Sequence, residues 1–222
     1  MVAPNIYQQR DYSKLTGLKG ISDQQIQVHL GLYAGYVKNT NTLNEKIVEL
    51  ANQGKAGTPE WAEMVRRLGF EYDGLILHEY YFGNLKPSGG GAGPVPGLGQ
   101  VTQQARGNEL DPNSTLGQAI QQGFGSIQDW LNAFKAVGAM RGVGWAILFQ
   151  DPVTGWLSNH WVTLHQDGIP AGFKPILVMD VWEHAFMVDY KPAERSKYID
   201  EFFENVDWAA VEQRLVEAKV TR

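Results

Sequence analysis

An aspartate and a histidine stand four residues apart late in the chain, directly after a short apolar run. The run, residues 175–179 (PILVM), is typical of a buried strand. Asp180 and His184 follow where such a strand should end. A carboxylate and an imidazole that leave a core strand together can supply half of a metal site. The plainer alternative is a capping aspartate beside a histidine at the edge of the core, and the spacing by itself leaves both open.

Two further histidines lie on segments whose apolar residues recur at helical spacing. His29 falls in a predicted helix that begins after a cap at Ser22 and runs to about residue 50. His78 falls in a predicted helix over about 73–82. A histidine on an apolar helical face is often only a hydrogen-bonded core residue. Two helices joined by a short connection pack antiparallel, so both imidazoles could also meet Asp180 and His184 at one point.

The amino-acid composition limits which side chains could bind a metal ion. The chain of 222 residues has no cysteine and five histidines. Any metal must therefore be bound by His, Asp or Glu, which favours Mn, Fe or Zn. The formal net charge of −5 argues against a nucleic-acid partner. The N-terminal residues show no signal-peptide pattern and no apolar run reaches the ~18 residues of a membrane span, so we expect a soluble, cytoplasmic protein with no membrane partner.

Helical patterns fill the first part of the chain, and strand patterns come later. The predicted helices cover about 22–50, 58–68, 73–82, 115–122 and 126–137, with two more from Pro192 and after Asp207. The predicted strands cover about 145–149, 156–164 and 175–179. This order predicts an α+β fold: an N-terminal antiparallel helical hairpin domain (1–86), a Gly/Pro-rich linker with an insertion (87–113), and a C-terminal domain (114–222) with a small three-stranded antiparallel sheet and flanking helices.

Several segments, in chain order, are similar to those of the iron/manganese superoxide dismutases. The most specific is 180–185 (DVWEHA), which resembles the C-terminal signature of that family. The others are 21–29, 36–41, 78–82, 86–91, 116–126, 142–145 and 190–208. The resemblance implies superoxide as substrate and one Mn or Fe ion held by His29, His78, Asp180 and His184, with a solvent molecule as fifth ligand. A redox-inert Zn would leave nothing for superoxide to reduce.

The resemblance also implies roles for residues around these ligands. Gln166 would be the hydrogen-bond donor that manganese-type members carry on the sheet domain. Gly74 stands where many iron-type members carry a glutamine on the second helix, so the pattern favours Mn. We interpret the neighbouring His165 as a surface or strand-end residue. Trp145 and Trp182 would form an apolar wall around the ion.

Tyr36 would be the gateway tyrosine that passes protons to the site. The family usually has seven residues between the first ligand and this tyrosine, and here there are six. At about 100° per residue, His29 and Tyr36 share one face of a regular helix, without the π-bulge that an extra residue requires. Tyr33 replaces a histidine of the family, Leu32 a funnel lysine, and Met187 a tyrosine that contacts that histidine across the dimer. These changes predict a rebuilt gateway.

Two charged residues complete the expectations. The resemblance implies that Arg195, in 195–198 (RSKY), attracts the anion. A chain with a net charge of −5 repels superoxide weakly, so local positive potential must provide the attraction. Glu183 would reach a ligand histidine of a second copy, which implies a homodimer or a tetramer. Two alternatives stay open: a non-enzymatic structural or interaction protein on this fold, and a metalloenzyme with altered, peroxidase-like redox activity.

Overall fold

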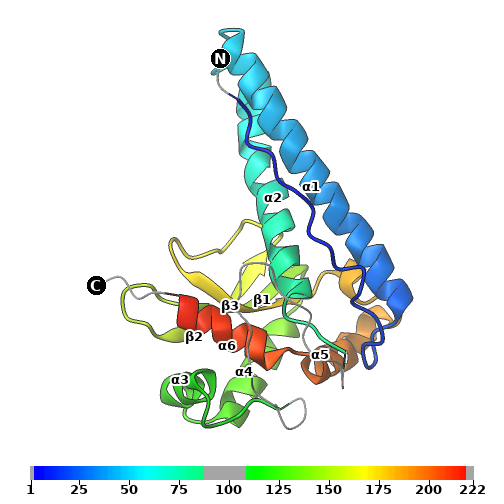
Figure 1. Ribbon diagram of the computed structural model, residues 1–222, viewed down its shortest axis with the longest axis vertical. Coiled ribbons are helices and arrows are strands. Elements are labelled where there is room, and N and C mark those ends of the chain that lie inside the picture. The colour runs from blue at the N-terminus through cyan, green and yellow to red at the C-terminus, as the bar shows by residue number, and fades with distance from the viewer. Residues whose placement is uncertain (1–2, 88–108, 219–222) are drawn as a thin grey trace.

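A long helical hairpin projects from a body built on a three-stranded sheet (Figure 1). The structure is a computed structural model, and it describes residues 3–87 and 109–218. Most of the predicted linker and insertion at 87–113 therefore lies outside the described residues. The division of the chain at 1–86 and 114–222 stays a prediction.

Two helices form the hairpin, α1 (Asp23–Asn52) and α2 (Pro59–Phe82). The side chains of Ser22 and Thr58 cap them by accepting a backbone N–H from the first turn. The prediction of two separate helices in the second arm is wrong, because α2 runs unbroken through Gly69. A glycine in a helix interior costs only about 1 kcal/mol relative to alanine, and packing against α1 outweighs that cost.

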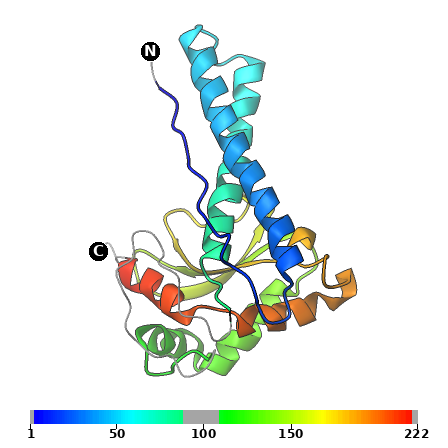
Figure 2. The ribbon, with the colours of Figure 1, turned by 45° about the vertical axis from the view of Figure 1, so that its right-hand side comes forward.

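The N-terminal segment runs along the hairpin without regular secondary structure (Figures 1 and 2). The side chain of Asn41 pairs with the backbone of Tyr7 in both directions, accepting at 2.7 Å and donating at 2.9 Å. Further along, the backbone N–H of Arg10 donates to Tyr33 Oη at 2.9 Å. Side chains of α1 therefore satisfy the backbone of a segment that has no strand or helix of its own.

The sheet is antiparallel in the order β2-β1-β3, from β1 (Gly144–Gln150), β2 (Leu157–Thr163) and β3 (Lys174–Asp180). The whole of β1 is buried, as a central strand covered on both faces should be. Its register places Trp145 opposite Asp180. The predicted three-stranded antiparallel sheet is confirmed, and its central strand fixes the residue that ends β3.

Helices cover the sheet and complete the α+β arrangement, which is confirmed. They are α3 (Thr115–Phe124), α4 (Ile127–Gly138), α5 (Arg195–Glu204) and α6 (Trp208–Glu217), with 3₁₀ turns η1 (Glu183–Ala185) and η2 (Pro192–Glu194). α4 packs on β1 and β2, whereas α6 and α2 pack on β3. Within 3–87 and 109–218, no helix combines the length and the apolar composition that a membrane span needs.

The end of α2 is fastened to the body by backbone and side-chain contacts. The backbone N–H of Lys86 donates to Asn205 O at 2.9 Å. The guanidinium of Arg214 donates to Tyr80 O at 3.0 Å and to Ile176 O at 3.2 Å, which joins the last turn of α2 to β3. These contacts fix the height of α2, and with it His78, against the strand that ends in Asp180.

Candidate metal centre

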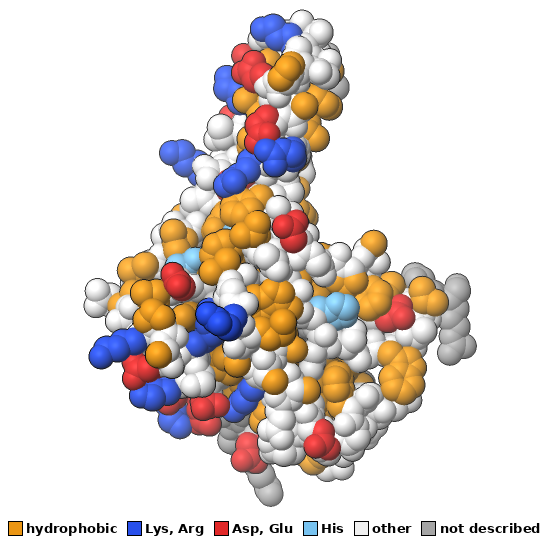
Figure 3. Space-filling view, turned by 180° about the vertical axis from the view of Figure 1, so that it is seen from behind, with side chains coloured by type: hydrophobic (Ala, Val, Ile, Leu, Met, Phe, Trp, Pro, Cys, Tyr) orange, Lys and Arg blue, Asp and Glu red, His pale blue; other side chains and the backbone are white. Residues whose placement is uncertain are grey.

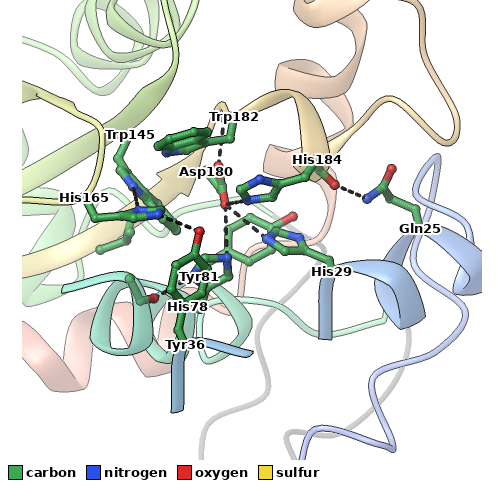
Figure 4. A network of polar contacts seen from close by, with 12 residues as sticks. Gln25, His29, Tyr36, His78, Tyr81, Trp145, His165, Asp180, Trp182 and His184 are labelled. Atoms are coloured by element: carbon green, nitrogen blue, oxygen red, sulfur yellow. Dashed lines mark hydrogen bonds and ion pairs between the residues drawn. The ribbon is translucent and has the colours of Figure 1, made fainter. Parts of the chain in front are cut away.

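Three imidazoles and one carboxylate meet where the base of the hairpin touches the end of β3 (Figure 4). His29 comes from α1, His78 from α2, Asp180 from the last position of β3, and His184 from η1. One nitrogen or oxygen atom of each side chain lies within 4.8 Å of those of the other three. The structure therefore brings together all four of the side chains that the sequence proposed as ligands.

The two oxygens of Asp180 have separate partners. Oδ1 accepts the backbone N–H of Trp182 at 2.8 Å. Oδ2 faces the histidines, at 3.0 Å from His29 Nε2, 3.1 Å from His184 Nε2 and 3.7 Å from His78 Nε2. The backbone thus orients the carboxylate so that one oxygen is aimed at the centre of the cluster.

The ring of His78 shows that the cluster fits a metal ion. Its Nδ1 lies 2.6 Å from the carbonyl oxygen of Gly74, which can only accept, so Nδ1 carries the hydrogen. Its Nε2 then has a lone pair, is buried, and has no hydrogen-bond partner among the described residues. A lone pair fixed in this way by a backbone carbonyl is typical of a metal-ligating histidine, and nitrogen and oxygen donors suit Mn or Fe.

Burial sets the charge state of the cluster. His29, His78 and Asp180 have no exposed surface. Burial lowers the pKa of His29, although Asp180 opposes it, and holds the pKa of His78 well below its usual value. Burial alone would raise the pKa of Asp180, but the charge of His184 and hydrogen bonds from His184 and His29 outweigh it and lower that pKa. Neutral rings of His29 and His78 beside an ionised Asp180 are the protonation states that metal binding requires of these side chains.

A buried glutamine on α1 holds the turn that carries His184. Gln25 Nε2 donates to the carbonyl oxygen of His184 at 2.7 Å, and Gln25 Oε1 accepts the backbone N–H of Val188 at 3.0 Å. Sequence reasoning did not assign Gln25 this role. The sequence feature that could have indicated this role is a polar residue one helical turn before His29, on the same buried face of α1.

His165 joins Tyr36 and Trp145 in a hydrogen-bonded row beside the ligands (Figure 4). His165 Nε2 lies 2.8 Å from Tyr36 Oη, and Trp145 Nε1 donates to His165 Nδ1 at 3.1 Å. The interpretation of His165 as a surface residue is wrong, because it is fully buried, although it does lie just after the end of β2. Leu164, with a φ of 55°, adopts the left-handed conformation directly after β2 and turns the next side chain inward. Gln166 is partly exposed, and its Oε1 has no partner among the described residues.

Trp145 also determines which nitrogen of His165 carries the hydrogen. An indole N–H can only donate, so His165 Nδ1 must accept and Nε2 must hold the hydrogen of the neutral ring. Burial lowers the pKa of His165 to about 4, which keeps the ring neutral at neutral pH. His165 therefore donates to Tyr36 Oη, and the proton of Tyr36 is left to point elsewhere. Burial also raises the pKa of Tyr36, so its hydroxyl stays protonated.

Two other predicted aromatic residues take different positions. Trp182 stacks on His165 at 4.8 Å and on His184 at 5.6 Å between ring centroids, so it walls the cluster as expected of an apolar screen. Tyr33 is buried in the hairpin, and its hydroxyl donates to Glu79 Oε1 at 2.9 Å. Its hydroxyl therefore joins α1 to α2 and does not face the ligands.

The predicted steering and interface residues lie at the surface or near it. Arg195 donates to the carbonyl oxygens of Met140 at 2.8 Å and Gly142 at 2.9 Å, and so closes the loop before β1. Glu183 is exposed. Leu32 and Met187, which replace gateway residues of the family pattern, are 39% and 46% exposed.

These features form a candidate site for one metal ion between a helical hairpin and an α/β body. Residues 112–214 match the family described as iron/manganese superoxide dismutases, C-terminal domain. Over 94% of this chain and 91% of the relative, the sequence is 35% identical to the superoxide dismutase [Fe] of Aquifex pyrophilus. It is 34% identical to the superoxide dismutase [Mn] of Haloarcula marismortui over 85% of this chain and 82% of the relative. It is also 34% identical to the superoxide dismutase [Mn/Fe] of Aeropyrum pernix, over 82% of this chain and 77% of the relative. The chain belongs to the iron/manganese superoxide dismutase family.

Proposed function

We propose that the protein disproportionates superoxide at one manganese or iron ion held by His29, His78, Asp180 and His184. Two superoxide anions and two protons become one O2 and one H2O2. The ion, when bound, supplies a centre that accepts and returns one electron. The observation that carries this proposal is the buried convergence of three imidazoles and one carboxylate, with a lone pair of His78 left unpaired.

The surrounding residues have assignable tasks in this reaction. Tyr36 keeps its proton and has it free to donate, because His165 already supplies the hydrogen bond to its oxygen. His165 is thus a positioning residue for Tyr36, a role that the sequence did not assign to it. Trp145 and Trp182 pack against the ligand rings and exclude water from the space beside them.

Manganese is the favoured ion in this proposal. His165, which bonds Tyr36, comes from the sheet side, the side from which the resemblance draws the hydrogen-bonding residue of manganese-type members. A side chain from α2 has no room, because a Cβ at Gly74 would lie 2.6 Å from the ring of Tyr36. The relatives carry names with Fe, Mn and Mn/Fe, so both ions need to be tested.

Turnover by defined metal forms tests the function. Purified protein is stripped of metal, reloaded with Mn or Fe, and assayed for superoxide decay and for peroxide-dependent oxidation of a dye. We expect fast superoxide decay in at least one loaded form and none in the stripped protein. Loaded protein that leaves superoxide untouched but oxidises the dye would favour the peroxidase-like alternative, and inactivity in both assays would favour the structural one.

A cytoplasmic location stays a prediction that cell fractionation would test.

We also propose that a second copy of the chain covers the surface beside His184. Four apolar side chains are exposed there: Val28 and Leu32 on α1, and Met187 and Val188 after η1, at 46%, 39%, 46% and 40%. These residues flank the contact of α1 with η1, and the exposed Glu183 lies within η1. Hydrophobic side chains are also plentiful where the hairpin meets the body on the face seen from behind (Figure 3). Exposed apolar side chains gathered on neighbouring elements favour association.

The oligomer is tested by sedimentation of the wild type and of Met187→Asp. We expect a dimer or tetramer for the wild type and a shift toward monomer for the variant, because a charge would be buried in the interface. Val153→Asp, which changes an apolar side chain that is 65% exposed in the turn between β1 and β2, is the control. A monomeric wild type would contradict this part of the proposal.

A further inference from the structure

A single arginine begins a stack of side chains that ends at Tyr36. The guanidinium carbon of Arg67, on α2, lies 4.0 Å from the centre of the Phe70 ring. The Phe70 ring meets His165 edge to face at 4.5 Å between centroids. His165 in turn is hydrogen-bonded to Tyr36 at 2.8 Å. A cation stacked on an aromatic face is held in place more firmly than a free surface side chain.

Arg67 forms an ion pair with Glu71, and Glu71 is the more deeply buried of the two side chains. Arg67 donates from Nε and Nη2 to Glu71 Oε1 at 2.9 and 2.7 Å, and Glu71 Oε2 accepts from Asn39 at 3.2 Å. The side chain of Glu71 is only 6% exposed, whereas that of Arg67 is 49% exposed. No described residue accepts a hydrogen bond from Arg67 Nη1. An anion that arrives from solvent therefore meets the guanidinium before it meets the carboxylate.

The charge of Arg67 acts on the row of residues beside the ligands. Burial is the main cause of the low pKa of His165, and Arg67 lowers it further. Burial, with Asp180 and Glu71, raises the pKa of Tyr36, and Arg67 opposes that rise. Figure 3 shows basic side chains part-way along the hairpin, above a band of hydrophobic ones near the body. Arg195, in contrast, has both terminal nitrogens engaged by backbone carbonyls.

We infer that Arg67, held by Phe70, is an anion-steering residue that draws small anions to the site from the α2 side. The inference rests on the proposed function in that superoxide is the anion of interest. In a chain with a net charge of −5, local positive potential must provide the attraction. Arg67 takes on the task that the sequence assigned to Arg195 alone.

Azide binding to the Mn-loaded protein tests the inference without turnover. Arg67→Gln is compared with Arg66→Gln, which removes the same charge one residue away from a side chain that is 76% exposed and paired with Glu63. We expect Arg67→Gln to weaken azide binding about two- to four-fold at low salt, as loss of one nearby charge in a high-dielectric surface region predicts, and to flatten its salt dependence. Arg66→Gln should behave as the wild type, and Arg67→Lys should restore most of the binding.

Two outcomes would overturn the inference: equal effects of Arg66→Gln and Arg67→Gln, which would indicate bulk charge, or no effect of Arg67→Gln at either salt concentration. If Arg67→Gln fails to fold, azide binding by Arg67→Lys tests the inference instead. Wild-type affinity and salt dependence in Arg67→Lys would support a role of the positive charge, and their loss would exclude it. A wild type that binds azide but leaves superoxide untouched would contradict the proposed function and not the steering role. Superoxide turnover that is independent of salt would contradict the steering role alone.

Discussion

At the scale of single residues, the site depends on hydrogen bonds whose direction is forced. The carbonyl of Gly74 leaves a lone pair on His78 Nε2, and the indole of Trp145 leaves a hydrogen on His165 Nε2. In the proposed reaction, the first arrangement would prepare His78 as a ligand, and the second would prepare Tyr36 as a proton donor. Neither depends on a bound ion, so both can be tested in the metal-free protein as well.

Tyr36→Phe and Tyr33→Phe separate proton delivery from packing. Tyr36→Phe removes the hydroxyl that bonds His165, so we expect superoxide turnover to fall by about tenfold or more, since a positioned proton donor contributes at least that much. Tyr33→Phe removes a hydroxyl that bonds Glu79, away from the ligands, and should cost about 1 kcal/mol of stability with turnover unchanged. Stopped-flow assays and chemical unfolding measure the two effects. A similar loss of turnover in both variants would contradict the assignment of Tyr36.

The neutral state of His165 predicts a dependence of stability on pH. Its pKa is about 4 in the folded protein and near the ordinary histidine value of 6.5 when the chain is unfolded. Between these values the unfolded chain binds more protons, so the free energy of unfolding falls as pH falls from about 6.5 toward 4. His165→Gln should remove up to about 3 kcal/mol of that fall, because each pKa unit corresponds to about 1.4 kcal/mol. Urea unfolding of the metal-free proteins at several pH values measures it, and parallel pH curves would refute it.

At the scale of elements, the two helices of the hairpin and the end of one strand place the chemistry. His29, Tyr33 and Tyr36 follow one another along one side of α1 because their spacing suits a regular helix. β1 holds Trp145 opposite Asp180 through its register with β3. The close passage of α1 and α2 at Gly74 leaves room for the ring of Tyr36 and for nothing larger than hydrogen at that position.

Glycine substitutions in α2 test this close passage. In Gly74→Ala the new Cβ would meet the Tyr36 ring at 2.6 Å, so we expect a loss of about 1–2 kcal/mol of stability after the gain in helix propensity. In Gly69→Ala, a control in the same helix, the new Cβ would meet no atom within 4 Å. We expect this variant to gain up to about 1 kcal/mol of stability. Thermal and urea unfolding compare the variants. Equal stabilisation by both substitutions would contradict the packing of Tyr36 against α2.

Sequence reasoning predicted the elements and the convergence of the four candidate ligands better than the residues beside them. Helical periodicity, caps and the segment 180–185 predicted the positions of His29, His78, Asp180 and His184. Whether His165 or Gln166 faces inward could not be predicted, because it depends on Leu164 adopting a left-handed conformation that non-glycine residues rarely take. The unbroken α2 was also missed, since glycine at position 69 weakens a helix without ending it.

At the scale of the whole molecule, the candidate metal joins two halves of the chain. Two ligands come from the hairpin and two from the end of β3 and the turn that follows it. Arg214 and the segment 84–86 already fasten these halves near the site. An ion that bridges them would resist the separation of hairpin and body as well as the unfolding of either.

Metal removal should therefore destabilise the entire fold. A ligand that binds only the folded state at a hundred times its dissociation constant adds about 2.7 kcal/mol, so the loaded protein should unfold several degrees higher than the stripped one. Calorimetry of both forms measures the difference. Unchanged unfolding temperatures after reloading would show that no ion links the two halves.

Metal content per chain is the most direct test of the claim that these four side chains hold one redox ion. Wild-type protein and two variants are loaded identically and analysed by mass spectrometry for bound metal. We predict about one Mn or Fe per wild-type chain and per chain of Asp189→Asn, whose carboxylate is exposed and accepts the backbone N–H of Ser22, and almost none in Asp180→Asn. Full retention of metal by Asp180→Asn would contradict the account.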